Sequence, residues 1–425
     1  MTSLQLVLWI ASGIFLQVAT YLGIGFWHHW RSYQALLKAA CACDLSVPDP
    51  GASQRPEAPL PWAGFRTFIV ERKDIEDPHG QVCSFYLVPE DQQALADFRP
   101  GQFLTFRLDT VAPNGDPRPI IRCYSLSDAP NPDRFRISIK RAPPPADSGL
   151  APGISSNFFH DHVEMGSRLQ ARAPSGHFYL DRSDAPVVLI GAGIGITPML
   201  SMLNWCLTHQ PEREIWLFYG VRDSTELVMQ AELSARAAAH ANFHLHLCFS
   251  NPGARDELPH PDPAVHRHHS RVDVALLRRL LPLKPYHYYI CGPGPMLASL
   301  VPALEDWGVP DARIHFEAFG PASVTRNHSS RVPAVAASDS RPVAVTLKKS
   351  GKVIHWQPGM GSLLDMAEAN GISVSSGCRA GSCGSCQTNI LFGEVAYTRV
   401  PDFDPEPGSC LLCVCTPKSA VTLEL

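Results

Sequence analysis

The chain has 425 residues, of which 45% are hydrophobic and 18% charged, a composition that suits about three folded domains and excludes a disordered protein. The formal net charge of −4 excludes a nucleic-acid-binding protein that relies on a basic surface. Pro is frequent, at 39 residues, and Cys numbers 13. Six of the cysteines fall in the last 48 residues, which indicates a metal site rather than a disulfide scaffold.

The N-terminus begins with an apolar run. Residues 4–27 carry no charge, and the first charged side chain is Arg31. As a helix this run would extend about 36 Å, enough to cross a bilayer core of about 30 Å. The lack of positive side chains before it favours a cytoplasmic location for the rest of the chain. A cleaved signal peptide is the alternative, but the run is long and has neither a basic start nor an A-x-A site. We expect a transmembrane anchor over residues 1–30 and a juxtamembrane linker over residues 31–62.

The rest of the chain divides into further parts that differ in their pattern of hydrophobic and turn-forming residues. Over residues 63–182, apolar stretches such as FRTFIV, CSFYLV and FRISIK alternate with Pro, Gly and Asp turns, which predicts an antiparallel β-barrel. Over residues 183–320, buried-strand runs such as VVLIGAG and IWLFYGV alternate with helical segments, which predicts an α/β domain with a doubly wound parallel sheet. Residues 321–341 have the composition of a linker, and residues 342–425 form a last compact domain.

The strongest chemical signal lies in this last domain. Cys378, Cys383 and Cys386 follow the C-x₄-C-x₂-C spacing of plant-type [2Fe–2S] sites, which need a fourth cysteine further on. A zinc site would favour paired C-x₂-C knuckles, and only one is present. Three later cysteines are each a candidate for the fourth ligand: Cys410, Cys413 and Cys415. If their segment is one strand, the last two face the same side, so alternation does not separate them.

A Gly-rich run opens the expected α/β domain. GAGIGITP, from Gly191 to Pro198, follows an apolar strand and begins a helix, and the N–H groups of such a turn bind phosphate well. Its G-x-G-x-G spacing departs from the G-x-G-x-x-G of the dinucleotide fingerprint. Two later strands end in YGVR and CGPGPM, and the carboxyl ends of parallel strands meet at one edge of a sheet. We therefore expect a nucleotide site at that edge.

The expected barrel contains residue types that suit a flavin diphosphate. Arg122, Tyr124 and Ser125 offer a cation for phosphate, an aromatic ring beside the isoalloxazine and a donor near its ring nitrogens. About thirty residues later, Gly153 and the ISSN that follows it supply small residues and N–H groups for a pyrophosphate.

Together, residues 64–320 resemble the ferredoxin–NADP reductase superfamily, and they are most similar to the reductase part of flavohaemoglobins. The motifs that carry the resemblance are RCYSLSDAP, ISIKR, SSNFFHDHVEMG, PSGHF, VVLIGAGIGITPML, YYICGPGPM and HFEAFGP. Residues 343–425 resemble plant-type ferredoxin domains of β-grasp (α+β) fold, whose last ligand is followed by a proline four residues on. Cys413 with Pro417 fits that pattern, so the resemblance favours Cys413 as the fourth ligand.

The resemblance implies a role for each matching residue. Arg122 binds the FAD phosphate, Tyr124 packs on the flavin, and Ser125 hydrogen-bonds near the flavin N5. The other implied contacts are Gly153, Ser155 and Ser156 for the pyrophosphate; Gly193 and Thr197 for the nicotinamide nucleotide; Cys291, Gly292 and Pro293 beside the nicotinamide; and Glu317 and Phe319 near the flavin. The ADSGLAPG insertion before Gly153 departs from the family pattern.

The order of anchor, flavin barrel, nicotinamide domain and ferredoxin resembles reductases of two-component oxygenases and of hybrid-cluster proteins. It implies an NADH- or NADPH-dependent oxidoreductase that passes electrons through FAD and a [2Fe–2S] cluster to an acceptor protein of one of those kinds. The implied location is the inner membrane, as a single-pass protein with cytoplasmic domains and no nucleic-acid partner. Because the cofactors supply the chemistry, no catalytic nucleophile or acid–base pair is expected.

The sequence also bears on which nucleotide is preferred and on two alternative functions. Ser250 is followed by Asn251 rather than the Arg common in NADPH-dependent relatives, so we expect NADH to be preferred, with Arg222 and Arg255 the obvious nearby cations. One alternative function is a subunit of a respiratory NADH:quinone oxidoreductase, but such subunits place the ferredoxin before the flavin domain. Another is a cluster-based redox sensor, which would need an output module that the sequence does not show.

Overall fold

The structure is a computed structural model that describes Trp62 and residues 64–111, 117–144, 152–253, 264–319 and 342–425, the last range without 373, 375, 378, 380, 382, 383, 399, 400 and 402–404. The chain divides into two units, Met1–Pro59 and Leu60–Leu425. In the first unit only Trp9, Gln17, Thr20 and Trp27 are described, so the expected transmembrane run lies otherwise outside the described residues. Among the helices that are described, none has the length and apolar character needed to span a bilayer.

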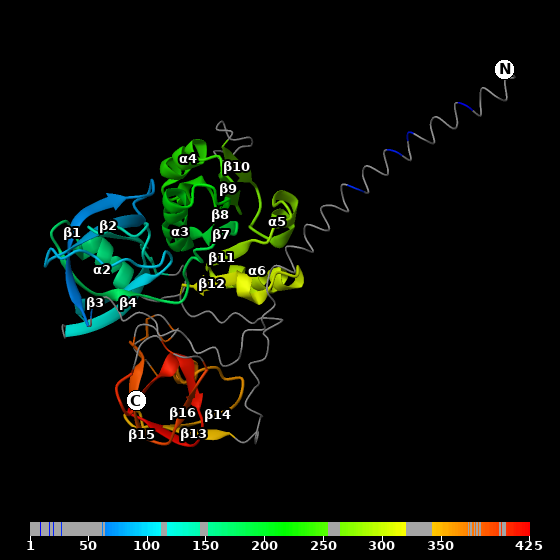
Figure 1. Ribbon diagram of the computed structural model, residues 1–425. Coiled ribbons are helices and arrows are strands. Elements are labelled where there is room, and N and C mark those ends of the chain that lie inside the picture. The colour runs from blue at the N-terminus through cyan, green and yellow to red at the C-terminus, as the bar shows by residue number, and fades with distance from the viewer. Residues whose placement is uncertain are drawn as a thin grey trace. The chain divides into compact units, whose positions relative to one another are not determined.

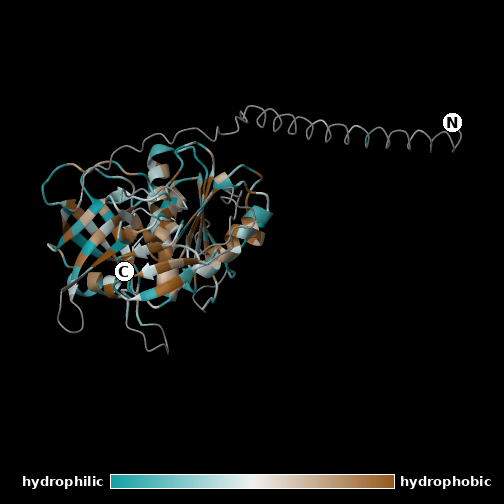
Figure 2. Cartoon of the chain, turned by 90° about the horizontal axis from the view of Figure 1, so that it is seen from below, coloured by the Kyte–Doolittle hydropathy of each residue, from teal (hydrophilic) through white to brown (hydrophobic). Residues whose placement is uncertain are grey.

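Six antiparallel strands form the first sheet of the second unit, in the order β4-β3-β6-β1-β2-β5 (Figure 1). They are β1 (Arg66–Ile75), β2 (Val82–Pro89), β3 (Phe103–Val111), β4 (Pro117–Ser125), β5 (Phe135–Lys140) and β6 (Arg168–Ser175). Leu126, just beyond β4, bridges Ile137 of β5, which joins the two edges. Hydrophobic and hydrophilic residues alternate along these strands (Figure 2), because successive side chains point to opposite faces. The expected β-barrel is therefore present.

One helix interrupts this barrel, where the sequence pattern indicated only strands. Helix α2 (Ile154–His162) buries Ser155 and Phe159, four residues apart and hence on one face. The Phe159 ring makes edge-on contacts with Phe85 at 5.3 Å and Phe106 at 5.5 Å between ring centroids. The aromatic core of the barrel therefore holds the helix, through contacts that span more than fifty residues of sequence.

A six-stranded parallel sheet forms the second part, in the order β10-β9-β8-β7-β11-β12. Its strands are β7 (Val187–Ala192), β8 (Ile215–Val221), β9 (Phe243–Phe249), β10 (Val265–His268), β11 (His287–Gly292) and β12 (Ile314–Ala318). Helices α3 (Ile196–His209) and α4 (Gln230–Ala239) cover one face, and α5 (Val274–Leu280) and α6 (Gly294–Asp306) cover the other (Figure 1). The strand order reverses between β7 and β11, which is where ligands bind in sheets of this kind.

The third part is a smaller α+β domain. Its mixed sheet has the order β14-β13-β19-β15-β17, and β16 pairs with β18 beside it. The elements are β13 (Val343–Leu347), β14 (Lys352–Trp356), α7 (Leu363–Ala369), β15 (Gln387–Phe392), β16 (Val395–Tyr397), β17 (Ser409–Leu411), β18 (Cys415–Pro417) and β19 (Val421–Leu423). A reciprocal capping box between Ser362 and Asp365 starts α7. The buried hydrophobic cluster of this domain is drawn from residues 345–425, so it has a core of its own.

Candidate functional site

A cavity of about 390 Å³ lies among residues of all three parts of the second unit. The barrel contributes β4 and the end of β5, the parallel sheet contributes β12 and the start of α3, and the Cys-rich loop contributes three residues. The lining comprises Phe103, Arg122, Cys123, Tyr124, Ser125, Ser138, Ile139, Lys140, Ile194, Thr197, Glu317, Ala318, Phe319, Ser376, Gly377 and Arg379. Its volume is typical of small-molecule and cofactor sites.

Tyr124 forms a fixed aromatic wall of this cavity. Its hydroxyl shares a hydrogen bond of 2.7 Å with Ser155 at the start of α2. Its ring packs edge-on against Phe159, with centroids 5.1 Å apart. Burial raises the pKa of Tyr124 to about 12, so the side chain remains a neutral phenol at physiological pH. These contacts leave a rigid aromatic surface of the kind that a flat ring system packs on.

Arg122 projects from the same face of β4 as Tyr124, because the two are two positions apart in the strand. Its Nη1 donates to the carbonyl oxygens of Ile121 at 2.7 Å and of Ser376 at 3.3 Å. Ser376 belongs to the Cys-rich loop, so Arg122 joins that loop to the barrel. Arg379 in the same loop is held by Glu368 at 2.6 Å and Asp365 at 3.1 Å, both on α7.

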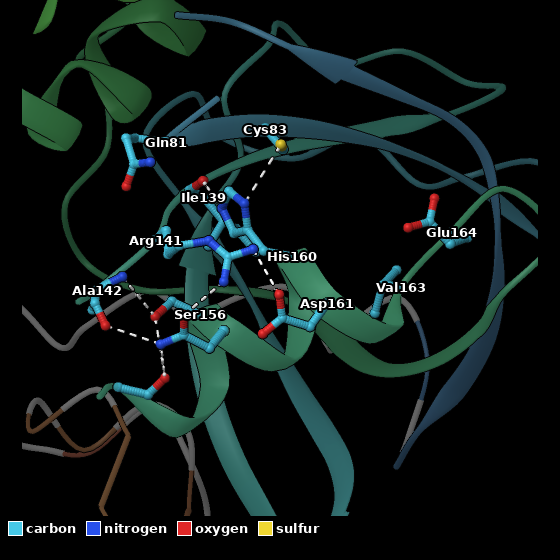
Figure 3. Close-up of polar contacts among 12 residues, drawn as sticks. Gln81, Cys83, Ile139, Arg141, Ala142, Ser156, His160, Asp161, Val163 and Glu164 are labelled. Atoms are coloured by element: carbon cyan, nitrogen blue, oxygen red, sulfur yellow. Dashed lines mark hydrogen bonds and ion pairs between the residues drawn. The ribbon is translucent and has the colours of Figure 1, made fainter. Parts of the chain in front are cut away.

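The N-terminal turn of α2 is docked on the segment after β5 (Figure 3). The Ala142 N–H donates to the Ser156 hydroxyl oxygen at 3.1 Å, and the Asn157 amide donates to the carbonyl oxygens of Ala142 and Gly153. A Cβ at Gly153 would lie 2.8 Å from that of Ala142, so a larger residue would push the turn away. Arg141 fixes the helix further along, through Asn157 at 3.0 Å and Asp161 at 2.7 Å.

On the other side of the cavity, two glycine-containing loops meet at the reversal of strand order. Gly193–Gly195 form a 3₁₀ turn after β7, and Gly193 has φ +53°. A Cβ at Gly195 would overlap the carbonyl oxygen of Cys291 at the end of β11. Thr197, in the first turn of α3, donates its hydroxyl to the Ile194 carbonyl oxygen at 3.0 Å. The GAGIGITP and CGPGPM segments are therefore in direct contact, as a shared nucleotide site requires.

Glu317 places a carboxyl group in the cavity wall. It lies on β12, opposite Cys291 of β11. The residue is partly exposed as a whole, but its Oε2 is buried and has no hydrogen-bond partner. Burial raises the pKa of Glu317 to about 8, against a smaller opposing effect of a hydrogen bond with Ser125. The carboxyl group is thus mostly neutral at pH 7 and can donate a hydrogen bond to a ligand. Phe319, two residues on, is 40% exposed at the rim.

The candidate cluster ligands are only partly described, because Cys378 and Cys383 lie outside the described residues. Cys386 is 3% exposed just before β15, and its carbonyl oxygen accepts from the N–H of Leu412 at 3.3 Å. That contact places Cys386 beside the segment that contains Cys413. No group of three metal-binding side chains converges among the described residues.

The segment from Cys410 to Cys415 is not one strand, contrary to the premise of the alternation argument. A 3₁₀ turn at Leu412–Val414 separates β17 from β18. Cys410 and Cys415 are fully buried, whereas Cys413 on the turn is partly exposed. The turn therefore separates Cys413 from the other two, a distinction that the spacing did not provide.

Six of the residues singled out from the sequence line the cavity: Arg122, Tyr124, Ser125, Thr197, Glu317 and Phe319. Ser155 does not line the cavity but is hydrogen-bonded to Tyr124, which does. Gly193 lies in the turn after β7, Cys291 and Gly292 end β11 with Pro293 directly after them, and Gly153 and Ser156 lie at the start of α2. Among the lining residues to which the sequence assigned no role are Phe103, Ser138, Lys140, Ile194 and Arg379. Three of these belong to motifs already noted, ISIKR and GAGIGITP, so the motif boundaries could have identified them.

Two protein families match this chain. Residues 189–301 match the oxidoreductase NAD-binding domain, and residues 345–418 match the 2Fe-2S iron-sulfur cluster binding domain. A flavohemoprotein of Halalkalibacterium halodurans is 36% identical over 267 residues, which is 63% of this chain and 62% of that protein. The chain thus spans less than two thirds of the length of that curated relative.

Solved structures show the same parts. The flavohem-like FAD/NAD binding domain of nitric oxide dioxygenase from Vibrio cholerae has a TM-score of 0.51 and 31% identity, covering 60% of this chain and 99% of that one. An intact type IV self-sufficient cytochrome P450 monooxygenase has a TM-score of 0.53 and 22% identity, covering 85% of this chain and 41% of that one. The second likeness concerns the fold alone, and it extends over all three parts.

Proposed function

The chain is an oxidoreductase of the ferredoxin–NADP reductase superfamily with a C-terminal 2Fe-2S iron-sulfur cluster binding domain, and from this premise we propose that it is an electron-transfer reductase for a partner protein. Electrons enter from NADH, pass through FAD and the [2Fe–2S] cluster, and leave to an acceptor of oxygenase or hybrid-cluster type. The observation that carries the proposal is the single cavity lined by the barrel, the parallel sheet and the Cys-rich loop.

The cavity residues suit FAD and a nicotinamide. When bound, FAD supplies the conversion of a hydride from NADH into single electrons, which a cluster carries onward. Tyr124 offers a fixed aromatic surface to the flavin, and Arg122 offers a cation to its phosphates. The buried, unpartnered Oε2 of Glu317 gives the nicotinamide side a polar group that still needs a partner, and the Glu317 carboxyl group can hold a proton there.

The remaining contacts hold the ends of the two nucleotides. The docked N-terminal turn of α2, with Gly153, Ser155 and Ser156, supports the FAD pyrophosphate through N–H groups. The Gly193–Gly195 turn and the Cys291–Pro293 segment would bind the nicotinamide nucleotide. Four residues would hold the cluster: Cys378, Cys383, Cys386 and Cys413.

Anaerobic mixing of the purified protein with NADH tests the proposal. We expect the visible absorbance of FAD to bleach within the mixing experiment, followed by the electron paramagnetic resonance signal of a reduced [2Fe–2S] cluster. Tyr124→Ala should bind FAD at least about tenfold more weakly, since base–aromatic and ring packing contacts contribute about 1–3 kcal/mol each. A protein that retains FAD but is not bleached by NADH would contradict the proposal.

We further propose that residues 4–27 anchor the protein in the inner membrane as a single span, with the remaining chain in the cytoplasm. The support is the uncharged, apolar character of this run. The burial of apolar residues in lipid is not screened by salt, so a high-salt wash distinguishes an anchor from an electrostatic attachment. Full-length protein should stay with membranes after a high-salt wash, and a chain that starts near Gly64 should be released. Release of both by salt alone would exclude the anchor.

A further inference from the structure

Helix α3 carries three polar residues on one face, at spacings of four and three residues. Thr197 lines the cavity, and Ser201 and Asn204 follow it along the helix. At 1.5 Å per residue, they lie about 6 Å and 10 Å beyond Thr197 along the helix axis. Both are buried, with Ser201 0% and Asn204 5% exposed. Buried polar side chains on an otherwise apolar helix require partners, and here the partner is supplied by the barrel.

That partner is Asp128, three residues beyond Ser125 of the cavity wall. The Ser201 hydroxyl donates to the Asp128 carbonyl oxygen at 2.7 Å, and the Asn204 amide donates to the Asp128 Oδ1 at 2.6 Å. The amide oxygen of Asn204 accepts from Arg236 of α4, which is paired in turn with Glu232. Both the nitrogen and the oxygen of the Asn204 amide therefore form hydrogen bonds, which fixes the orientation of the side chain.

On the barrel side, Asp128 adjoins a second hydrogen-bond network, which is formed by Ser127 and Arg136. The N–H of Ser127 donates to the Arg136 carbonyl oxygen at 2.8 Å, and Arg136 Nε donates to the Ser127 hydroxyl at 3.2 Å. The Arg136 side chain is 5% exposed, and its Nε lies 3.8 Å from Asp128 Oδ2. The contact between Asp128 and α3 thus connects two buried networks, one in each domain, and each network resists movement of its own half.

We infer that Asp128, Ser201 and Asn204 are positioning residues that set the separation between the flavin-side and nicotinamide-side walls of the cavity. The inference rests on the proposed function, in which NADH gives up a hydride and leaves as NAD⁺ while FAD gains the two electrons. Such a transfer needs its reacting atoms about 3–3.5 Å apart. Ser125 lines the cavity from the barrel and Thr197 lines it from the α/β domain. Asp128 follows Ser125 by three residues, and Asn204 follows Thr197 by two helical turns. The contact between Asp128 and Asn204 therefore ties the two elements together close to the cavity.

The test compares four single variants and the double variant Asp128→Ala/Asn204→Ala, all as full-length protein loaded with FAD. Asn204→Ala and Asp128→Ala remove the side-chain hydrogen bond between Asn204 and Asp128, whereas Asp128→Asn keeps an acceptor oxygen at the same place. Asn242→Ala is the matched control, because Asn242 donates to the Arg213 carbonyl oxygen at 2.7 Å entirely within the α/β domain. All five are mixed with NADH and with NADH deuterated at the transferred position, and FAD reduction is followed by absorbance.

We expect both contact-removing variants to reduce FAD about 10- to 100-fold more slowly, the penalty typical of a misplacement near 1 Å, with FAD content unchanged. The charge-transfer absorbance between reduced FAD and NAD⁺ should weaken, and the isotope effect on FAD reduction should rise as transfer becomes limiting. The double variant Asp128→Ala/Asn204→Ala should be no slower than either single variant, because both lose the same contact. Asp128→Asn and Asn242→Ala should reduce FAD close to the wild-type rate.

A second measurement does not depend on turnover. In protein freed of FAD, hydrogen–deuterium exchange should increase over the first two turns of α3 and over Ser127 and Asp128 in Asn204→Ala, but not in Asn242→Ala. Unchanged exchange there, or equal slowing of FAD reduction in the control, would overturn the inference. A wild-type protein that binds FAD but is not reduced by NADH would overturn the proposed function and this inference together, whereas active wild type with unimpaired Asn204→Ala overturns the inference alone.

Discussion

Glu317 on β12 of the α/β domain and Ser125 at the end of β4 in the barrel line the same cavity. The two residues are 192 positions apart in the sequence, and each comes from a different sheet. The Oε2 atom of Glu317 is buried and has no hydrogen-bond partner. The cavity therefore contains a carboxyl group whose environment favours the protonated form, because a buried charge without a partner is costly.

The raised pKa of Glu317 predicts a pH dependence of stability in protein freed of FAD. Below the ordinary pKa of 4.5 this carboxyl group is protonated in both the folded and the unfolded chain. Between pH 4.5 and about 8 the unfolded chain releases the proton and the folded protein retains it. The free energy of unfolding should therefore fall as the pH rises through this window, since the unfolded state binds fewer protons.

Denaturant unfolding at pH 5 and pH 8 measures this effect. Glu317→Gln keeps the shape of the side chain but does not titrate, so it should lose less stability than the wild type between the two pH values. Equal losses in the two proteins would show that the pKa of Glu317 is not raised in the folded state.

Gly195 is predicted to tolerate no side chain. Its φ of −62° suits any residue, so the restriction is purely steric: a Cβ would overlap the backbone of Cys291. Gly195→Ala should destabilise the protein by about 1–3 kcal/mol and displace the Gly193–Gly195 turn from β11, with loss of NADH binding. Gly220→Ala is the control, because its Cβ would meet its nearest neighbour, Val272, at an ordinary 3.6 Å. Similar melting temperatures and NADH affinities for the two variants would contradict the prediction.

The expected preference for NADH has a structural reason at Arg222. Its guanidinium is held by Glu226, with Nη2 and Oε1 2.6 Å apart, and the Arg222 N–H also donates to that carboxylate. The Glu226 charge offsets the cation and would repel a 2′-phosphate. Glu226→Gln should raise the ratio of kcat/KM for NADPH over NADH about tenfold, since hydrogen bonds to charged groups contribute about 1.5–3 kcal/mol. Steady-state rates with both nucleotides measure it, and an unchanged ratio would place the 2′-phosphate site elsewhere.

The fourth cluster ligand is predicted to be Cys413. Cys413→Ser should abolish or strongly perturb the visible and electron paramagnetic resonance spectra of the [2Fe–2S] cluster. Cys410→Ser and Cys415→Ser should retain both spectra, because those two thiols are fully buried in the core of the domain. Loss of the cluster in Cys415→Ser alone would assign that residue as the ligand instead.

Local patterns in the sequence predicted the parts of this fold that local chemistry determines. Alternation identified strands such as β5, and the apolar run before Gly191 identified β7 with the phosphate-binding type of turn after it. Helix α2 was missed, since Phe159 is held by aromatic rings far away in the chain. The 3₁₀ turn at Leu412–Val414 was missed because no Gly or Pro marks it.

The candidate site likewise contains residues that local motifs identify and residues that only long-range packing identifies. Arg122, Tyr124 and Glu317 were identified from motifs, and all three line one cavity. The contact of Asp128 with Ser201 and Asn204 was not anticipated, because it depends on how two domains pack. None of the three residues has a type or spacing that is unusual for a surface loop or a helix, so only the folded arrangement identifies them.

The separate hydrophobic core of residues 345–425 predicts that the ferredoxin domain can be removed without unfolding the rest. The cavity residues that would contact FAD and nicotinamide precede residue 320, apart from Ser376, Gly377 and Arg379. A chain that ends near Pro321 should retain FAD, be bleached by NADH and reduce ferricyanide. It should reduce cytochrome c much more slowly than the full-length protein, because the cluster is the proposed exit for electrons.

The isolated domain from residue 342 onward is the complementary control. It should bind a cluster and show no reaction with NADH, since it lacks both the barrel and the Gly193–Gly195 turn. If the truncated chain instead reduces cytochrome c at the full-length rate, electrons reach that acceptor directly from the flavin. Arg122, whose guanidinium contacts Ser376 in the full-length protein, would then lie at the exit itself, and the natural partner would have to dock on the barrel.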